Sequence, residues 1–301
     1  MADGTNRRAF LGAGVSLAAA GLLTGRTEAQ TARAKVVVVT CPKAISESDE
    51  ADAVAVRAMM DAGMKSLTGA DTPDAAWASV VKADDKVALV DAGTWLLNVP
   101  AVYAEVARGI QSAKPAKLTL AVCKYTAANG EYMGRLKAAL GAAAVSADLL
   151  DSTLYALPCR FGDAFTLMAT LPTVKSHPIS AVSGAVKHYA TLTAGKIADY
   201  HPNGMENAGK VLADEFGKHR HLTIIDGLRW GNGRKGPSTY RKCLVFSTDP
   251  VAADAVALKL FLETDKPQTD VPPQRHIERA QTEFKAGVAD LARIDIVDLK
   301  V

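Results

Sequence analysis

The 301-residue sequence predicts an α/β protein with a largely parallel sheet and helices on both faces. Three observations lead to this fold class. Apolar runs such as residues 35–40 are continuous and β-branched, as in strands covered on both faces. Segments with apolar residues at helical spacing follow these runs. The two kinds of segment alternate, which is the order of a parallel sheet with crossover helices.

In the first half of the chain, strands and helices are expected in strict alternation. The expected strands are residues 35–40, 84–91 and 117–123, and the expected helices are residues 48–67, 100–113 and 131–141. The first helix begins with acidic residues, which favour a helix N-terminus. The second has a proline in its first turn, where a missing backbone N–H costs little.

After Asp151 the pattern is less regular. Strands are expected at residues 165–171, 221–226, 243–248 and 294–299, and helices near residues 207–216, 249–263 and 273–288. Asp249 and Pro250 fit an N-cap and the first helical position. Because no repeat or low-complexity linker interrupts the chain, we expect a single α/β domain over residues 30–301 with an elaborated C-terminal half.

Residues 1–29 predict an export signal rather than part of the fold. The order Arg-Arg-x-Phe-Leu, which begins at Arg7, resembles the twin-arginine signal. The apolar run over residues 12–24 is shorter than the ~20 residues that span a bilayer, and cleavage after Ala29 suits its small residues. The alternative is a chance basic start to an amphipathic helix. We therefore expect the twin-arginine export machinery as a partner, a periplasmic location and no stable membrane insertion after cleavage.

Charge and cysteine content argue against several classes of protein. The formal net charge is +3 and no block of like charges stands out, which argues against a nucleic-acid partner. The four cysteines, Cys41, Cys123, Cys159 and Cys243, are widely spaced and contain no Cys-x-x-Cys, so no iron–sulfur or zinc-finger pattern is present. Burial as small apolar residues is their expected role, and disulfide pairing in an oxidising compartment stays open.

Polar clusters follow the predicted strands, where ligands bind in open α/β sheets. The five clusters are Asp91, Cys123 with Lys124, residues 175–187, Asp226 with Gly227, and residues 247–249. If every strand is parallel, these clusters meet at one edge of the sheet. A small-molecule site is therefore expected there.

The richest cluster lies between residues 171 and 196. Ser183 and Gly184 precede a predicted helix, whose first backbone N–H groups are expected to face an anion. Lys187 lies about one turn later and supplies a charge or, if desolvated, a nucleophilic amine. His177 suits proton transfer or metal binding. His177 and Lys187 are the catalytic candidates, and Lys175, Ser183 and Gly184 are anion-binding candidates.

Other candidates each have a structural alternative. Asp226 suits a turn, Gly233 belongs to a flexible glycine-rich loop, and Asp249 suits a helix cap beside Thr248. His201 is a candidate metal ligand together with His177, whereas His188 is the weaker candidate. Carboxylate ligands would favour Mg²⁺ or Ca²⁺, and histidine ligands would favour nickel, zinc or iron.

Three stretches resemble a family known as domain of unknown function 362. They are residues 171–188, 224–237 and 246–260, and the resemblance extends roughly over residues 35–299. The resemblance implies an uncharacterised bacterial or archaeal domain, and many relatives carry ferredoxin-type cysteines that imply a redox role. This chain lacks those cysteines. It also lacks a Lys-Pro-Asn run common after the second strand, which Asp91 or Asn98 would replace.

The spacing of His177, Ser183, Gly184 and Lys187 is also similar to a pattern in the nickel-pincer lactate racemase family. This similarity implies that His177 is an acid/base or nickel-proximal group. It also implies that Lys187 attaches a nickel-pincer-like cofactor.

Two functions remain open. The first is an exported enzyme acting on a small anionic or phosphorylated molecule, with a metal or redox cofactor as an option. His177 would then be the acid/base, Lys175 and Lys187 would neutralise charge, and Asp226 and Asp249 would orient bases or hold a cation. The second is a periplasmic module that binds an anion or cofactor without catalysis, using the same basic residues.

Overall fold

The structure is a computed structural model that describes residues 33–91, 95–122, 124–150, 164–192, 197–232, 236–267 and 269–301. Residues 34–301 form one compact unit. In its described residues, ten strands form one mixed sheet that is mostly parallel. The predicted α/β class with a largely parallel sheet is confirmed.

Seven of the strands form the central path of the sheet, in the order β10-β1-β9-β7-β4-β2-β3. Their bounds are β1 Ala34–Thr40, β2 Lys86–Asp91, β3 Lys117–Val122, β4 Leu167–Thr170, β7 Arg220–Gly231, β9 Cys243–Ser247 and β10 Ile294–Lys300. Strands β7, β4, β2 and β3 are mutually parallel, and β10 is parallel to β1. Only β9 in this path runs antiparallel to its neighbours β1 and β7.

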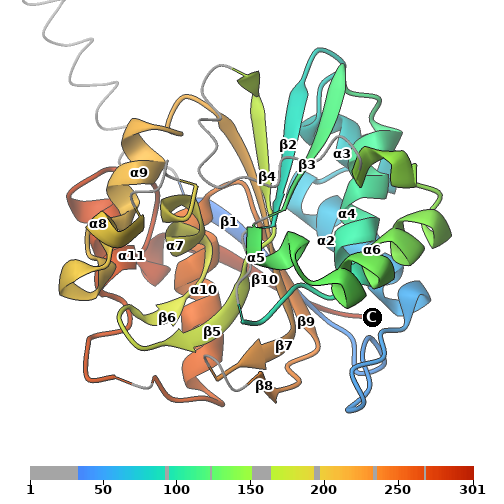
Figure 1. The fold of residues 1–301 in the computed structure, drawn as a ribbon. Coiled ribbons are helices and arrows are strands. Elements are labelled where there is room, and N and C mark those ends of the chain that lie inside the picture. Colours follow the sequence, from blue (N-terminus) through green and yellow to red (C-terminus); the bar gives the residue numbers. More distant parts are fainter. Residues whose placement is uncertain are drawn as a thin grey trace, which may run out of the picture. The chain divides into compact units, whose positions relative to one another are not determined.

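Helices cover both faces of the sheet (Figure 1). One face carries α2 (Ala53–Thr68), α3 (Pro73–Val80), α4 (Pro100–Ser112) and α6 (Gly130–Ala142). The other carries α7 (Ala185–Ala190), α9 (Ala208–Asp214), α10 (Pro250–Leu262) and α11 (Arg275–Thr282). Shorter segments are α5 (Lys124–Ala127), α8 (Ile197–Tyr200) and 3₁₀ turns at Ala147–Leu150, Pro202–Met205 and Leu291–Arg293.

Strand β1 shows why the apolar runs are continuous. Val37 and Val39 pack against the helices of one face, and Val36 and Val38 pack against those of the other. All four side chains are at most 4% exposed. Because alternate side chains point to opposite faces, a strand covered on both sides has to be apolar at every position.

Strand β7 extends past the main sheet and carries a second, smaller set of strands. Its first half pairs with β4 and β9, and its second half pairs with β5 (Thr173–His177) and β8 (Pro237–Thr239). Strand β5 in turn forms an antiparallel hairpin with β6 (Ala181–Ser183). This extension lies beyond the carboxyl ends of β4 and β2.

The expectation that all five polar clusters share one edge of the sheet is wrong for residues 247–249. Strand β9 is antiparallel, and Ser247 at its end pairs with Thr223 near the start of β7. Residues after Ser247 therefore lie at the opposite edge. The physical reason is that the described residues between β7 and β9 form no helix, whereas a parallel return needs a crossover of a dozen or more residues that is usually helical.

Some elements differ from the sequence expectation in extent. Helix α3 was not expected, although Thr72 caps it and Pro73 occupies its first turn. His177 ends strand β5 rather than lying in a loop. The last helix ends at Thr282 because the chain turns soon afterwards, with a positive φ at Lys285.

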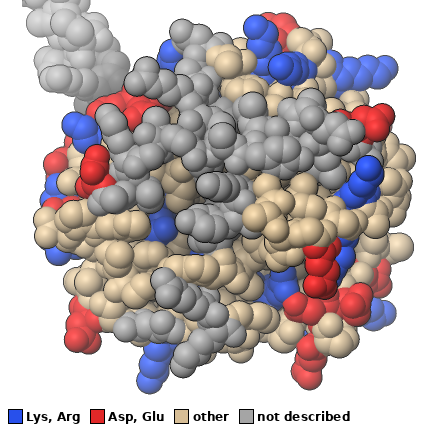
Figure 2. Space-filling model, in the orientation of Figure 1, with Lys and Arg blue, Asp and Glu red and all other residues tan. Residues whose placement is uncertain are grey.

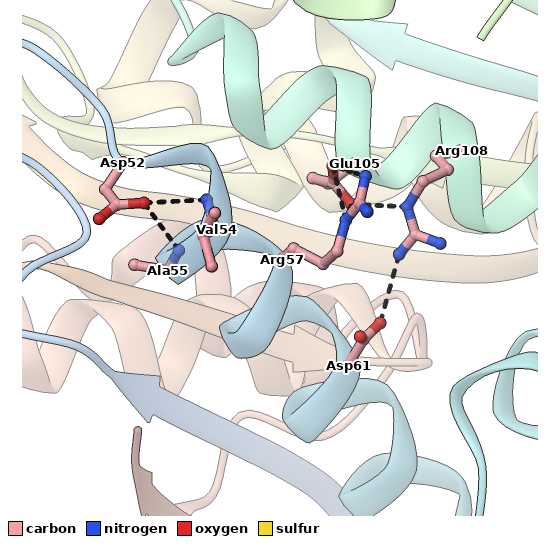
Figure 3. A network of polar contacts seen from close by, with 7 residues as sticks. All are labelled: Asp52, Val54, Ala55, Arg57, Asp61, Glu105 and Arg108. Atoms are coloured by element: carbon pink, nitrogen blue, oxygen red, sulfur yellow. Dashed lines mark hydrogen bonds and ion pairs between the residues drawn. The ribbon is translucent and has the colours of Figure 1, made fainter. Parts of the chain in front are cut away.

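A charged network joins α2 to α4 on the first face (Figure 3). Glu105 is only 4% exposed and accepts from Arg57 at 3.0 Å and from Arg108 at 2.7 Å. Arg108 also reaches Asp61 at 3.3 Å. At the start of α2, the carboxylate of Asp52 accepts from two backbone N–H groups. A buried carboxylate between two guanidinium groups keeps its charge paired, so the two helices are held in one register.

On the surface, basic and acidic side chains are interspersed around the periphery of the face drawn in Figure 2. Within the described part of the chain, no helix is both long enough and apolar enough to cross a bilayer. Cys41 and Cys243 are buried free thiols, in the role expected for them. Cys123, Cys159 and the predicted signal at residues 1–29 lie outside the described residues.

Candidate functional site

The β5–β6 hairpin and helix α7 gather most of the predicted site residues. Lys175 and His177 belong to β5, and Lys187 belongs to α7. Ser183 on β6 pairs directly with Lys175. The side chains of these residues are between 5% and 8% exposed. The structure therefore brings Lys175, His177, Ser183 and Lys187 together, and it makes them part of a nearly buried cationic cluster.

His177 is held in one tautomer by its own turn. Its Nδ1 accepts from the backbone N–H groups of Ile179 and Ser180, both at 3.2 Å. A nitrogen that accepts hydrogen bonds carries no proton, so the proton of the neutral ring lies on Nε2. Burial, and then the charge of Lys187, lower the pKa of His177 to about 3. At neutral pH the ring is an uncharged Nε2–H donor.

Two rings lie beside the His177 imidazole. Trp95 lies nearly parallel to it with ring centroids 5.7 Å apart, and His201 does so at 6.2 Å. Trp95 is 41% exposed, and His201 is half-buried. The nearly buried ring of His177 thus lies beside two side chains that are themselves partly exposed to solvent. Sequence reasoning missed Trp95, and its only signal was an aromatic residue in the loop after a predicted strand.

Lys187 is a buried amine without a counter-charge in the described part of the chain. No hydrogen bond or ion pair reaches its Nζ from any residue that the structure describes. Burial, and then the charge of Lys175, lower the pKa of Lys187 to about 7. The Nζ of Lys175 donates to the hydroxyl of Thr173 at 3.2 Å. Close to neutral pH, Lys187 is therefore divided between ammonium and free amine.

Two further histidines contribute to the same region. Burial, and then the charge of Lys175, lower the pKa of His188 to about 3, and burial followed by Lys187 lowers the pKa of His276 on α11 to about 4. The Nε2 of His188 and the Nδ1 of His276 are buried without a hydrogen-bond partner among the described residues. His188 thus belongs to the cluster despite being the weaker sequence candidate. Sequence reasoning missed His276, which lies in a different helix.

The backbone N–H groups at the start of α7 already bind a carboxylate of the protein itself. Asp254 of α10 accepts from the N–H groups of Ala185 and Val186, the second at 2.8 Å. A Cβ atom on Gly184 would lie 2.1 Å from the Asp254 carboxylate, so glycine is required for this contact. Burial raises the pKa of Asp254 to about 7. The expected anion-binding role of the Ser183-Gly184 turn is corrected, because these donors bind a side chain of the protein.

The carboxylate of Asp226 also accepts hydrogen bonds from backbone N–H groups. It accepts from Val99 at 2.6 Å, just before α4, and from Leu228 at 3.2 Å. Burial raises the pKa of Asp226 to about 6. The neighbouring Asn98 donates to the carbonyl of Leu171 at 2.9 Å. These contacts fix the loop that leads into α4, and they leave Asp226 at the edge of the cluster in a supporting position.

The remaining sequence candidates do not join the cluster. Asp249 caps α10, with its carboxylate accepting from Val251 and Ala252, and it also accepts from Val288 at 2.9 Å. Asp249 and Thr248 lie at the opposite edge of the sheet because β9 is antiparallel. Gly233 lies outside the described residues.

A cavity of about 220 Å³ opens next to Trp95. Its lining includes Tyr132, Arg135 and Arg229. Tyr132 is buried and lies 3.5 Å from the Asp91 carboxylate at the end of β2. Trp95 therefore lines this cavity and also lies beside the ring of His177.

The comparison with models of protein families identifies the family of the chain. Residues 100–259, just over half of the chain, match the model of a domain of unknown function, DUF362. The chain belongs to this family. No curated protein and no solved structure matches the chain.

The DUF362 match covers a shorter part of the chain than residues 35–299. It runs from α4 to α10 and contains Lys175, His177, Lys187 and Asp254. Trp95 and His276 lie outside the match. The cationic cluster of this DUF362 protein is thus built mainly from the matched region and completed by residues on either side of it.

Proposed function

We propose that this DUF362 protein is an enzyme that acts on a small anionic molecule bound by the cationic cluster. One observation carries the proposal: Lys175 and Lys187 are both buried, and no described carboxylate pairs with Lys187. An unpaired buried ammonium costs several kcal/mol, which a bound anion offsets. A carboxylate or phosphate ligand supplies the missing negative charge.

His177 is suited to orient and polarise such a ligand. Its Nε2–H is fixed as a donor because Nδ1 accepts two backbone hydrogen bonds. A neutral imidazole held in this way stabilises negative charge on a substrate oxygen without needing protonation, as the neutral histidine of triosephosphate isomerase does. We therefore assign His177 to hydrogen-bond donation, in place of the acid/base role expected from the sequence.

A nickel-pincer-like cofactor or a divalent metal does not fit these residues. A metal ligand has to present a lone pair, but Nδ1 of His177 already accepts two donors and Nε2 carries the proton. Among the described residues, no group of three histidine, cysteine, aspartate or glutamate side chains is arranged to hold a metal ion. Asp226 and Asp249 lie at opposite edges of the sheet. No step of the proposed function passes through a metal.

A binding module without catalysis is the second candidate. The observation in its favour is the same fixed tautomer, since a histidine that only donates moves no proton. Both candidates require anion binding, and they differ in the fate of the bound molecule. An enzyme converts it, whereas a binding module releases it unchanged, so mass spectrometry of the ligand after incubation separates them.

Sulfate binding should depend on the protonation of Lys187. Sulfate keeps its charge between pH 6 and pH 8, while Lys187, with its pKa lowered to about 7 by burial and Lys175, loses its proton over this range. The dissociation constant measured by calorimetry is expected to rise about tenfold from pH 6 to pH 8.

The matched comparison uses two lysine variants. Lys187→Met should abolish the pH dependence and weaken sulfate binding at pH 6 by at least about tenfold. Lys210→Met should leave binding unchanged, since Lys210 is exposed on α9 and pairs with Asp214. Equal sulfate affinity for wild type and Lys187→Met at pH 6 would contradict the proposed anion site, because Lys187 would then not take part in binding.

We also propose that the protein reaches the periplasm through the twin-arginine export machinery. The supporting observation is the paired arginine at Arg7 followed by a short apolar run. The protein recovered from the periplasm of its own host should begin near Gln30 by N-terminal sequencing. Arg7→Lys with Arg8→Lys should keep it in the cytoplasm, and periplasmic recovery of that variant would contradict this route.

A further inference from the structure

We propose that Lys187 is a nucleophile that condenses with the carbonyl group of an anionic aldehyde or ketone, such as a 2-oxo acid, to form a Schiff base. The proposal rests on the proposed function, because the negative charge of this substrate is what the surrounding cations bind. It adds the class of substrate and the atom that reacts.

The position of Lys187 provides the geometric basis. Lys187 belongs to the short helix α7. Two backbone N–H groups at the start of α7 donate to Asp254 of α10, and these hydrogen bonds fix the position of α7. Lys187 is 7% exposed, and its Nζ has no partner among the residues that the structure describes. A buried amine without a carboxylate has nothing to hold its proton, and its lone pair is not engaged by a donor.

The neighbours of Lys187 favour the free amine over the ammonium. Burial, and then the charge of Lys175, lower the pKa of Lys187 to about 7. A desolvated lysine next to a second cation is the known environment of lysines that form Schiff bases. Exposed lysines are almost entirely protonated at neutral pH. Lys187 is therefore the amine that is poised to react under physiological conditions.

The other residues of the cluster have separate tasks in this arrangement. Lys175 is the cation that binds the carboxylate of a 2-oxo acid, and its Nζ is positioned by the hydroxyl of Thr173 at 3.2 Å. The Nε2–H of His177 donates to the carbonyl oxygen, because its Nδ1 is occupied by backbone donors. Trp95 and His201, both partly exposed to solvent, lie beside the ring of His177.

The covalent step balances without an oxidant or a metal. The lone pair of the Lys187 Nζ attacks the carbonyl carbon, a C–N bond forms, and the electron pair of the C=O bond moves to oxygen, which takes up a proton. The nitrogen loses a proton and its lone pair then expels the hydroxyl group, which leaves with a proton as water. One C=N bond replaces one C=O bond, and hydrolysis returns the free lysine.

Reductive trapping tests the proposal directly. The folded protein is incubated at pH 7 with pyruvate and sodium cyanoborohydride, and its peptides are mapped by mass spectrometry. We expect one carboxyethyl group on Lys187, with labelling at least about tenfold above that of any exposed lysine, because exposed lysines are protonated at this pH. Methyl pyruvate, which has the same 2-oxo carbonyl group but lacks the negative charge, should label Lys187 less than pyruvate does.

Two variants sharpen the experiment. Lys175→Met removes the neighbouring positive charge, so the pH at which labelling of Lys187 is half-maximal should rise. This shift is not expected from loss of a merely structural side chain. Lys210→Met, in an exposed ion pair on α9, should leave the labelling of Lys187 and its pH midpoint unchanged.

The outcomes separate this proposal from the one on which it rests. If sulfate and pyruvate bind but the reductant labels only exposed lysines, Lys187 is not the nucleophile, and anion binding still stands. If neither anion binds, the proposed function fails as well. If labelling of Lys187 saturates with increasing pyruvate and is inhibited by sulfate, the result supports both the anion site and the nucleophilic role of Lys187.

Discussion

Replacing Gly184 with alanine is expected to lower the free energy of unfolding by about 3 kcal/mol. The new methyl group would lie 2.1 Å from the Asp254 carboxylate, so the carboxylate has to move. The N–H groups of Ala185 and Val186 then lose their acceptor in a buried position. Each unsatisfied donor costs about 1 to 3 kcal/mol. Urea denaturation of the two proteins measures the difference.

A double-mutant cycle shows whether Asp254 is the cause. In an Asp254→Ala background the carboxylate is already absent, so adding Gly184→Ala should cost less than about 1 kcal/mol. Gly134→Ala is the matched control, because a Cβ atom at Gly134 in α6 meets nothing within 4 Å. That change should stabilise the protein by up to about 1 kcal/mol, since alanine is the better helix former. Additive costs at Gly184 and Asp254 would contradict the steric explanation.

Replacing Lys187 with methionine is expected to stabilise the fold by about 2 kcal/mol at pH 7 while removing the anion site. Methionine has a similar length and needs no counter-charge. The gain should depend on pH in a defined direction. Burial and the charge of Lys175 lower the pKa of Lys187 to about 7, from an ordinary value of 10.5. Between these two values the unfolded chain holds the additional proton, so wild-type stability rises with pH relative to the variant.

The measurement is the difference in unfolding free energy between Lys187→Met and wild type at pH 6, 7, 8 and 9. We expect the difference to be nearly constant below pH 7 and to shrink steadily above it. Lys210→Met should show no such trend, because Lys210 is exposed and pairs with Asp214 at 3.6 Å. A variant less stable than wild type at every pH would show that the Lys187 amine has a stabilising partner.

The strands of the first half could be predicted because the central residues of each form a mostly apolar run that is buried on both faces. The direction of β9 could not be read from such a run, since residues 243–248 look the same in a parallel or antiparallel strand. The sequence between Asp226 and Cys243 nevertheless indicated the direction of β9, because its apolar residues do not recur at helical spacing. Antiparallel strands need no crossover helix, so the missing helix indicated the reversal.

The cationic cluster was predictable in part, because Lys175, His177 and Lys187 are close in sequence. Asp254 was missed although it is the one acidic residue within the mostly apolar helix α10, and a buried carboxylate there requires donors. His276 and Trp95 reach the cluster from α11 and from the loop after β2. Their positions beside the cluster depend on the packing of segments that are far apart in the chain, and the spacing of residues in the sequence carries no information about this packing.

The position of β1 constrains the time at which the sheet can be completed. Strand β1 comes first among the described strands, whereas its two neighbours, β9 and β10, follow all the others in sequence. An emerging polypeptide therefore leaves both edges of β1 unpaired until β9 and β10 have left the ribosome. Such distant pairing slows folding, so the late-arriving residues 294–300 close the sheet, and a protein shortened before them would expose an aggregation-prone edge.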